Sequence, residues 1–419
     1  MLNQVIKYIN RLNPAITVQA PSRINLINPL DAVEGDFWMP SVAVYGFKNP
    51  LSTFVYIKEI SNESRVKFYD IRKEGDRFNF KVSEYILNKN RMKLKNSLVD
   101  DIKLIYGSIY RFSKTSATFW KKFKEENIEL GILPTIPRQS GLGGSASIII
   151  AVLYAFAKYF KLYGNLASIK NHEYPINKDI IAEMATKVED RDLKIVAGYS
   201  DRYTICRGGL GFCCYIGKLY HKKISFEPLA IYDRIDELYG INNLPLIVAY
   251  SGVLHDSGNV HKKLRKLYLE NDREIIEKYK LLAETAWKSR FALMRHDWKL
   301  LGDFFKQNNQ IMNKLMKYAG FEHGIGYTNN LMIKLIEDHP AVYAVKLTGA
   351  GGGGSVFALT NPDRIDEVLS EWEKRVKRLI TDDNQLKIIV PKFDSKLVED
   401  LRNAEFFKIK ISNCGVKKI

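Results

Sequence analysis

Residues 138–147 read RQSGLGGSAS and run directly into the apolar stretch IIIAVLYAFAKYF at 148–160. Glycine costs backbone entropy in a folded segment, so a cluster of glycines indicates a backbone shape or a close approach that side chains would prevent. The stretch that follows contains no glycine or proline and is long enough for a buried helix. The pattern therefore predicts a glycine loop that ends at the N-terminus of a buried helix.

A loop of this kind can bind a phosphate group through its backbone. The first N–H groups of a helix have no partner within the helix, and the helix dipole adds positive potential there. The alternative is an ordinary capping turn in which serine hydroxyls satisfy those N–H groups. The chain has no G-x-x-x-x-G-K-[ST] motif, so this is not a Walker A loop. We predict that a phosphate group is bound by Gly141, Leu142, Gly143, Gly144, Ser145, Ala146 and Ser147.

A second glycine cluster, TGAGGGGS at 348–355, lies between two apolar segments that are predicted to be strands. So many glycines would weaken an ordinary hairpin unless some group must approach the backbone closely. Two glycine loops in separate halves of the chain predict a ligand held between two domains. We expect the substrate to contact Gly349, Gly351 and Gly352.

The segment AGYSDRYTICRGG at 197–209 places Asp201 among small residues, after a predicted helix with an acidic end. Phosphoryl transfer requires positioning, charge neutralisation and a group that takes the proton of the acceptor hydroxyl. Asp201 is the candidate base and Arg23 its candidate cationic partner. Glu189 and Ser145 are the candidate ligands of a metal ion, because their oxygens suit a hard cation. Taken alone, Asp201 also fits an aspartate that caps a turn.

The composition indicates a globular protein of two domains. The chain has 419 residues, of which 46% are hydrophobic, and its formal net charge is +17. No apolar run reaches the roughly 18 residues that cross a bilayer, and the cysteines form no C-x-x-C, so we expect a cytoplasmic protein without a membrane contact. The basic clusters fall on predicted helices, where charge normally lines the solvated face, so nucleic acid is not an expected partner.

The periodicity of apolar residues predicts alternating strands and helices. Strands are expected at residues 16–27, 41–60, 65–82, 208–229, 243–252, 343–360 and 406–412, and helices at 84–127, 145–162, 177–190, 258–318 and 362–379. We place the two domains at residues 1–225 and 226–419.

Three segments together resemble the GHMP kinase family of galacto-, homoserine, mevalonate and phosphomevalonate kinases. They are APSRINLI at 20–27, PRQSGLGGSAS at 137–147 and KLTGAGGGGSVFALT at 346–360. The resemblance implies an α+β fold with a ribosomal S5-like N-terminal domain and a ferredoxin-like C-terminal domain, and ATP with Mg²⁺ between them. It also implies an enzyme that phosphorylates an alcohol group, with Asp201 as base and Arg23 near the acceptor. By the same resemblance, Glu189 and Ser145 are ligands of Mg²⁺, and residues 141–147 form the loop that binds the phosphates of ATP.

Within the family, the chain looks most similar to the glucuronokinase-like branch. The similarity lies in AGYSDRY at 197–203, HDSGNVHKKLRK at 255–266 and NPLDAVEGD at 28–36. It implies a sugar or sugar acid as the acceptor, phosphorylated at its anomeric hydroxyl, with Asn28 and Asp31 as sugar ligands. The chain departs from the common GLGSSAS sequence at Gly144, which removes one hydroxyl from the loop.

Other functions stay open at this point. A mevalonate-pathway kinase is the first, although the polar segment DAVEGD at 31–36 argues against an apolar isoprenoid pocket. A catalytically inactive family member that binds ATP or sugar is the second, although Arg23, Glu189 and Asp201 are all present. A nucleic-acid-binding protein would depend on net charge alone. The sequence does not indicate an oligomeric state.

Overall fold

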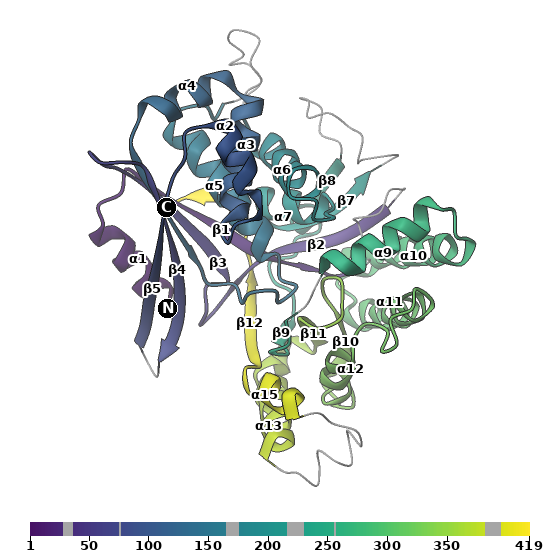
Figure 1. Ribbon diagram of the computed structural model, residues 1–419. Helices are drawn as coiled ribbons and strands as arrows, with labels where there is room; N and C mark the ends of the chain where they lie inside the picture. The colour runs from purple at the N-terminus through teal and green to yellow at the C-terminus, as the bar shows by residue number, and fades with distance from the viewer. Residues whose placement is uncertain (28–36, 75–76, 165–175, 216–229, 255–256, 382–394) are drawn as a thin grey trace.

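The structure is a computed structural model that describes the chain except residues 28–36, 75–76, 165–175, 216–229, 255–256 and 382–394. A mixed sheet of 13 strands extends through both halves of the molecule (Figure 1). Along its main path the strand order is β10-β11-β9-β12-β2-β1-β3-β6-β4-β5. None of the described helices is long and apolar enough to cross a membrane.

Strand β1 is central in the N-terminal half of the sheet. Its first residues pair with β3 and its last residues, from Ser22 to Asn25, pair with β2. Strand β4 pairs with β6 in the parallel sense, and β6 is an element that the sequence pattern did not predict. The strands here are β1 (Ile16–Asn25), β2 (Phe37–Gly46), β3 (Ser52–Glu59), β4 (Arg65–Glu74), β5 (Arg77–Ile86) and β6 (Ile128–Pro134).

The predicted buried helix after the glycine loop is α5 (Gly144–Tyr159). Every residue from Ala146 to Ala157 is buried, because the helix packs against β1 and β3 on one side and against other helices on the other. An apolar surface all round a helix requires such complete burial. The other helices of this half are α1 (Leu2–Arg11), α2 (Arg91–Asn96), α3 (Lys103–Thr115), α4 (Ala117–Glu125), α6 (Lys178–Lys187) and α7 (Ser200–Arg207).

The long helical region predicted at 258–318 is divided into three helices. Asp272 and Asp297 mark the breaks, since their carboxylates accept hydrogen bonds from the backbone N–H groups of Ile275 and Leu300 at 3.1 and 3.0 Å. The C-terminal helices are α8 (Ile235–Tyr239), α9 (Ser257–Leu269), α10 (Arg273–Met294), α11 (Trp298–Tyr318), α12 (Tyr327–Lys334), α13 (Ile365–Thr381) and α15 (Ser395–Arg402).

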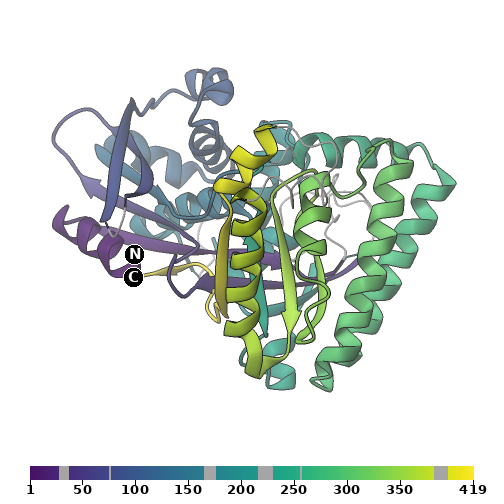
Figure 2. The same ribbon diagram turned by 90° about the horizontal axis from the view of Figure 1, so that it is seen from below.

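Helices cover both faces of the C-terminal strands (Figure 2). Val356 of β11 packs in one apolar cluster with Trp372 of α13, whereas the next residue, Phe357, packs in another with Phe305 of α11. Alternate residues of a strand face opposite sides, so each cluster fills one face. The remaining strands are β7 (Leu210–Tyr215), β8 (Ala230–Arg234), β9 (Leu246–Tyr250), β10 (Val342–Leu347), β11 (Ser355–Thr360), β12 (Glu405–Ile411) and β13 (Lys417–Lys418).

The end of the chain returns to the N-terminal half. Strand β12 lies between β9 and β2, and β13 pairs with β1. Between them, Ser412 accepts a hydrogen bond from the N–H of Gly209 at 2.7 Å, and the N–H of Val416 donates to Ile205 of α7 at 2.8 Å. The boundary predicted between residues 225 and 226 lies outside the described residues, so the two domain ranges stay a prediction.

Gly415 allows this last segment to pass close to α7, and a pair of variants tests its importance. Gly415 and Gly240 both have positive φ, +59° and +67°, so alanine introduces about 1–2 kcal/mol of backbone strain at either position. A Cβ at Gly415 would lie 2.4 Å from the carbonyl oxygen of Cys206, whereas one at Gly240 would meet no atom within 4 Å. Thermal unfolding should therefore show a clearly larger loss for Gly415→Ala than for Gly240→Ala. Equal losses would contradict this role of the chain end.

Candidate active site

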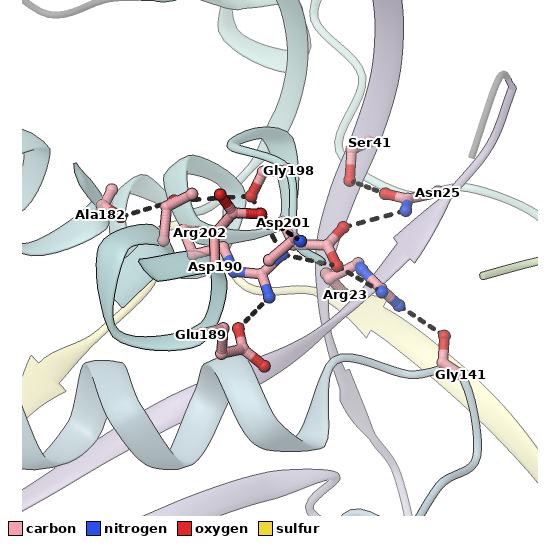
Figure 3. Close-up of polar contacts among 12 residues, drawn as sticks. Arg23, Asn25, Ser41, Gly141, Ala182, Glu189, Asp190, Gly198, Asp201 and Arg202 are labelled. Atoms are coloured by element: carbon pink, nitrogen blue, oxygen red, sulfur yellow. Dashed lines mark hydrogen bonds and ion pairs between the residues drawn. The ribbon is translucent and has the colours of Figure 1, made fainter. Parts of the chain in front are cut away.

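Asp201, at the start of α7, faces two residues of β1 (Figure 3). Arg23 Nη2 donates to Asp201 Oδ2 at 2.5 Å, and Asn25 Nδ2 donates to Asp201 Oδ1 at 2.9 Å. Ser41 Oγ in turn donates to Asn25 Oδ1 at 2.8 Å, which fixes the orientation of the amide. The fold thus brings together the two residues predicted to act on the acceptor and adds Asn25 to them.

The surroundings of Asp201 determine its charge. Burial alone would raise the pKa of this carboxyl group. The charge and hydrogen bond of Arg23, the charge of Arg202 and the hydrogen bond of Asn25 outweigh burial and hold the pKa well below its ordinary value. Asp201 is therefore ionised at neutral pH. It is a weak proton acceptor at equilibrium but a strong acceptor of a hydrogen bond from a hydroxyl group.

Arg23 also holds the phosphate loop, the name used here for residues 141–147. Its Nη1 donates to the carbonyl oxygen of Gly141 at 2.5 Å. The carbonyl oxygen of Leu142 accepts from Ser22 Oγ at 2.7 Å and from the N–H of Arg23 at 3.3 Å. One strand therefore positions both the loop and Asp201.

The phosphate loop has the predicted shape. Gly141 and Gly143 have φ of +74° and +78°, which favour glycine, and Gly143 caps α5. The first hydrogen bond of the helix runs from the N–H of Ser147 to the carbonyl oxygen of Gly143 at 2.9 Å. The N–H groups of residues 144–146 lie before this bond and have no acceptor within the helix. The first turn contains no acidic residue. This geometry is suited to a phosphate group, although ATP binding stays a prediction.

The two serines of the phosphate loop face different surroundings. The side chain of Ser145 is exposed at the first turn of α5. The hydroxyl of Ser147 is fully buried and donates to the carbonyl oxygen of Ala20 on β1 at 3.1 Å. Ser147 therefore anchors the helix to the sheet. Its hydroxyl is not available to ATP, so a contact with ATP would have to use its backbone.

The second glycine loop, residues 348–355, packs directly against the residues that begin the phosphate loop. Ser355 Oγ donates to the carbonyl oxygen of Ser140 at 2.8 Å. A Cβ added at Gly349 would lie 3.1 Å from the Cα of Gly141. The same loop reaches β1, since Thr348 Oγ1 accepts from the N–H of Asn25 at 3.1 Å. The backbone of the second glycine loop is therefore approached closely, as predicted, and the group that approaches it is the start of the phosphate loop.

The three glycines predicted to contact the substrate have different environments. Gly349 lies against the phosphate loop, and a Cβ at Gly351 would lie 2.8 Å from the carbonyl oxygen of Ile325. Gly352 has no atom within 4 Å of the position of a Cβ. Substrate contact stays a prediction for all three, and the protein itself accounts for the close packing at Gly349 and Gly351.

Glu189 lies in η3 (Val188–Asp192), a short π-helical segment that follows α6. Its Oε2 contacts Nη2 of Arg202, and Nη1 of Arg202 lies 3.5 Å from Asp201 Oδ2 (Figure 3). Sequence reasoning did not include Arg202 or Asn25. Asn25 could have been found, because it lies two residues after Arg23 on the same strand. Residues two apart on a strand share a face. For Arg202 the sequence offered only its position next to Asp201.

The predicted Mg²⁺ ligands fit the ion in their chemistry. The described part of the chain has no cluster of three or more His, Cys, Asp or Glu side chains that could hold a metal alone. Mg²⁺ typically uses one or two protein oxygens and takes the rest from phosphates and water. Ser145 supplies a hydroxyl oxygen, and Glu189 has a second carboxylate oxygen besides the one that contacts Arg202. Asn28 and Asp31 lie outside the described residues.

Comparison with known proteins decides the family. The family model described as GHMP kinases N terminal domain matches residues 104–209, and the one described as GHMP kinases C terminal matches residues 291–378. The chain belongs to the GHMP kinase family. The family resemblance seen in its three motifs is thereby confirmed.

Similar GHMP kinases differ in the acceptors that their names give. The chain is 28% identical to probable glucuronokinase 2 of Arabidopsis thaliana, over 60% of the chain. The match spans 62% of the length of that glucuronokinase, which is less than two thirds. The chain is 24% identical to D-glycero-alpha-D-manno-heptose 7-phosphate kinase of Campylobacter jejuni, with 83% and 90% covered. It is also 24% identical to mevalonate kinase of Thermococcus sibiricus, with 84% and 91% covered. All three are named as kinases.

The fold agrees with that of solved GHMP kinases. Mevalonate kinase of Methanococcus jannaschii superimposes with a TM-score of 0.61 over 95% of this chain and 98% of its own, at 19% identity. The predicted α+β fold of two domains is confirmed at the level of the family, with one large mixed sheet as its centre.

Two glycines of the second glycine loop test whether that loop supports the phosphate loop. Gly349 and Gly352 both have φ of +82°, so alanine strains the backbone equally at the two positions. Only at Gly349 would the added Cβ press on the phosphate loop. We expect Gly349→Ala to weaken ATP binding in a calorimetric titration, and Gly352→Ala to change it much less. A larger loss in Gly352→Ala would instead indicate that a ligand occupies the open side of that residue.

The ionisation of Asp201 gives a pH dependence. Because its pKa is held below the ordinary value of about 4, turnover should show no acid limb from Asp201 above that pH. Arg23→Met removes the largest opposing effect, so burial should then raise the pKa of Asp201 and move the limb upward. Profiles of kcat against pH for wild type and Arg23→Met check this. The acid limb that belongs to Asp201 is the one that is absent from the profile of Asp201→Asn. Parallel profiles for wild type and Arg23→Met would contradict it.

Proposed function

We propose that this protein transfers the terminal phosphoryl group of ATP to a hydroxyl group of a sugar or sugar acid, at the anomeric position. The observation that supports the proposal most is the double contact of Arg23. This buried side chain binds the carboxylate of Asp201 and the carbonyl oxygen of Gly141, so one cation links the candidate acceptor site to the phosphate loop. Donor and acceptor would therefore meet beside a fixed positive charge.

The chemistry follows from the charges. The acceptor hydroxyl donates a hydrogen bond to Asp201, which orients its oxygen toward the phosphorus atom. Because the pKa of Asp201 is low, the proton moves late, when the oxygen has already begun to bond to phosphorus. Arg23 stabilises the negative charge on the reacting oxygens, and the N–H groups at the start of α5 hold the phosphate chain. Mg²⁺, held by Ser145 and Glu189, would neutralise phosphate charge.

Polar groups around Asp201 favour a sugar as the acceptor. The carboxylate of Asp201 lies between the guanidinium group of Arg23 and the amide of Asn25, which Ser41 holds in place. A charged site of this kind matches an acceptor with several hydroxyl groups better than an apolar one, since desolvating charged groups beside an apolar ligand is costly. The names of two relatives, a glucuronokinase and a heptose 7-phosphate kinase, agree with this choice.

A uronic acid would need a cation opposite its carboxylate. Lys262, Lys263 and Arg265 of α9 are the candidates for this cation. Arg265 Nη1 already contacts Asp190 Oδ1 at 2.7 Å, and Lys263 Nζ lies 5.0 Å from the ring centre of Phe321. Lys262 is exposed on the same helix. Both the uronic acid and the matching neutral sugar therefore belong in the substrate test.

The second candidate function is a mevalonate kinase, because a relative with that name matches 84% of the chain. An assay that couples ADP release to a colour change separates the two, with sugars, uronic acids, mevalonate and homoserine as acceptors. We expect turnover with a sugar or a uronic acid and none with mevalonate. Turnover with mevalonate alone would overturn the sugar assignment, and no turnover with any acceptor would favour an inactive homologue. A cytoplasmic location stays a prediction.

The role of Asp201 is tested by Asp201→Asn, which keeps the size of the side chain and removes its charge. A positioned general base contributes about 10²–10⁴-fold to the rate, so kcat should fall by that factor. The affinity for ATP should change little, because the predicted nucleotide contacts lie on the phosphate loop. Steady-state kinetics and an ATP titration on the same preparation measure both effects. Unchanged turnover in a folded Asp201→Asn protein would overturn the mechanism.

A further inference from the structure

Arg202 is a buried cation between two carboxylates that have different predicted roles (Figure 3). One guanidinium nitrogen contacts Glu189, a candidate metal ligand. The other lies 3.5 Å from the carboxylate of Asp201, the candidate base, and donates to the carbonyl oxygen of Gly198 at 3.1 Å. Three oxygens from three separate positions in the chain therefore fix the plane of one guanidinium group.

The charges of the site alternate in space. Arg23, Asp201, Arg202 and Glu189 follow one another as cation, anion, cation and anion, and none of these side chains is more than 11% exposed. Breaking one pair in such a buried set leaves an uncompensated charge, which is strongly destabilising. Arg202 is the member that joins the two pairs.

The acids that neighbour Glu189 have arginine partners of their own. Asp190 contacts Arg265 of α9 at 2.7 Å, and Asp192 contacts Arg111 of α3 at 2.5 Å. Each acid of η3 thus has an arginine from a different element, and Glu189 is the one that Arg202 holds. Close by, Tyr203 Oη donates a hydrogen bond of 3.2 Å to Glu183.

We propose that Arg202 is a positioning residue that sets the separation between Glu189 and Asp201, so that the metal-bound phosphate and the acceptor hydroxyl are aligned. The inference rests on the proposed phosphoryl transfer. A guanidinium group suits this role better than an ammonium group, because it is planar and can bond to two carboxylates in fixed directions. Alignment matters because a misplacement of about 1 Å can lower a rate by 10²-fold.

Two substitutions test the kinetic part, with a matched control on the same helix. Arg202→Met should lower kcat on the order of 10²-fold with little change in the KM of ATP or acceptor, and Arg202→Lys should recover part of the loss. The control is Arg207→Met, which breaks the 2.6 Å contact with Asp179 outside the site and should leave kcat near that of wild type. In an Asp201→Asn background, Arg202→Met should lower kcat much less, because the residue that it positions has already lost its function.

A second measurement uses the unliganded protein. Arg202→Met leaves two buried carboxylates with one cation, so its melting temperature should fall. Adding Glu189→Gln removes one of those charges and should recover part of the loss. The same addition to Arg207→Met should recover nothing. If Arg202→Met does not fold, Arg202→Lys with and without Glu189→Gln provides the comparison.

The outcomes separate the two proposals. Full turnover in Asp201→Asn would overturn the proposed function and this inference with it. A large loss in Asp201→Asn together with wild-type kcat in Arg202→Met would overturn only the inference. Three other results would assign Arg202 a structural role alone and likewise overturn the inference. The first is a change in KM as large as the change in kcat, and the second is an equal loss of kcat in the Asp201→Asn background. The third is that the decreases in melting temperature caused by Arg202→Met and Glu189→Gln simply add in the double variant.

Discussion

The buried contact of Arg23 with Asp201 is the interaction on which the rest of the site depends. It joins β1 to α7, and the same guanidinium group reaches the carbonyl oxygen of Gly141. Strand β1 can support this contact because it pairs with β2, β3 and β13, which leave its backbone little freedom. Burial alone would raise the pKa of this carboxyl group, and Arg23 supplies the largest effect that opposes burial. The negative charge of Asp201 is therefore retained in the folded core because Arg23 is buried beside it.

Local patterns predicted the elements well and their contacts less well. The glycine loop before α5 was predictable because a left-handed backbone and a helix start are properties of a few neighbouring residues. The strand, loop and strand around residues 348–355 were predictable for the same reason. The sequence showed that some group must approach Gly349, but a pattern of small residues does not identify that group. The structure identifies it as the phosphate loop itself.

Strand β6 was not predicted, and the cause is specific. Strand β6 contains Glu129 and Gly131, which are poor strand residues by propensity. Glu129 is buried because it accepts hydrogen bonds from Tyr56 and Arg65, and a Cβ at Gly131 would lie 1.9 Å from the ring of Tyr56. Both residues are thus explained by neighbours on other strands. Arg202 belongs to the same class, since its contact with Glu189 depends on how η3 folds back against α7.

The balance of buried charge limits what can attract ATP. The two arginines of the site are paired with Asp201 and Glu189, so they attract a distant phosphate group little and act on oxygens in direct contact. Attraction must then come from the backbone N–H groups at the start of α5, from its helix dipole and from the Mg²⁺ that accompanies the nucleotide. Few of the described Lys and Arg residues are buried. The net charge of +17 therefore acts mainly at longer range, where it can speed the encounter with an anion but cannot orient it. Orientation is supplied by the glycine loop, and this is why its backbone must be held from two sides, by Arg23 and by the second glycine loop.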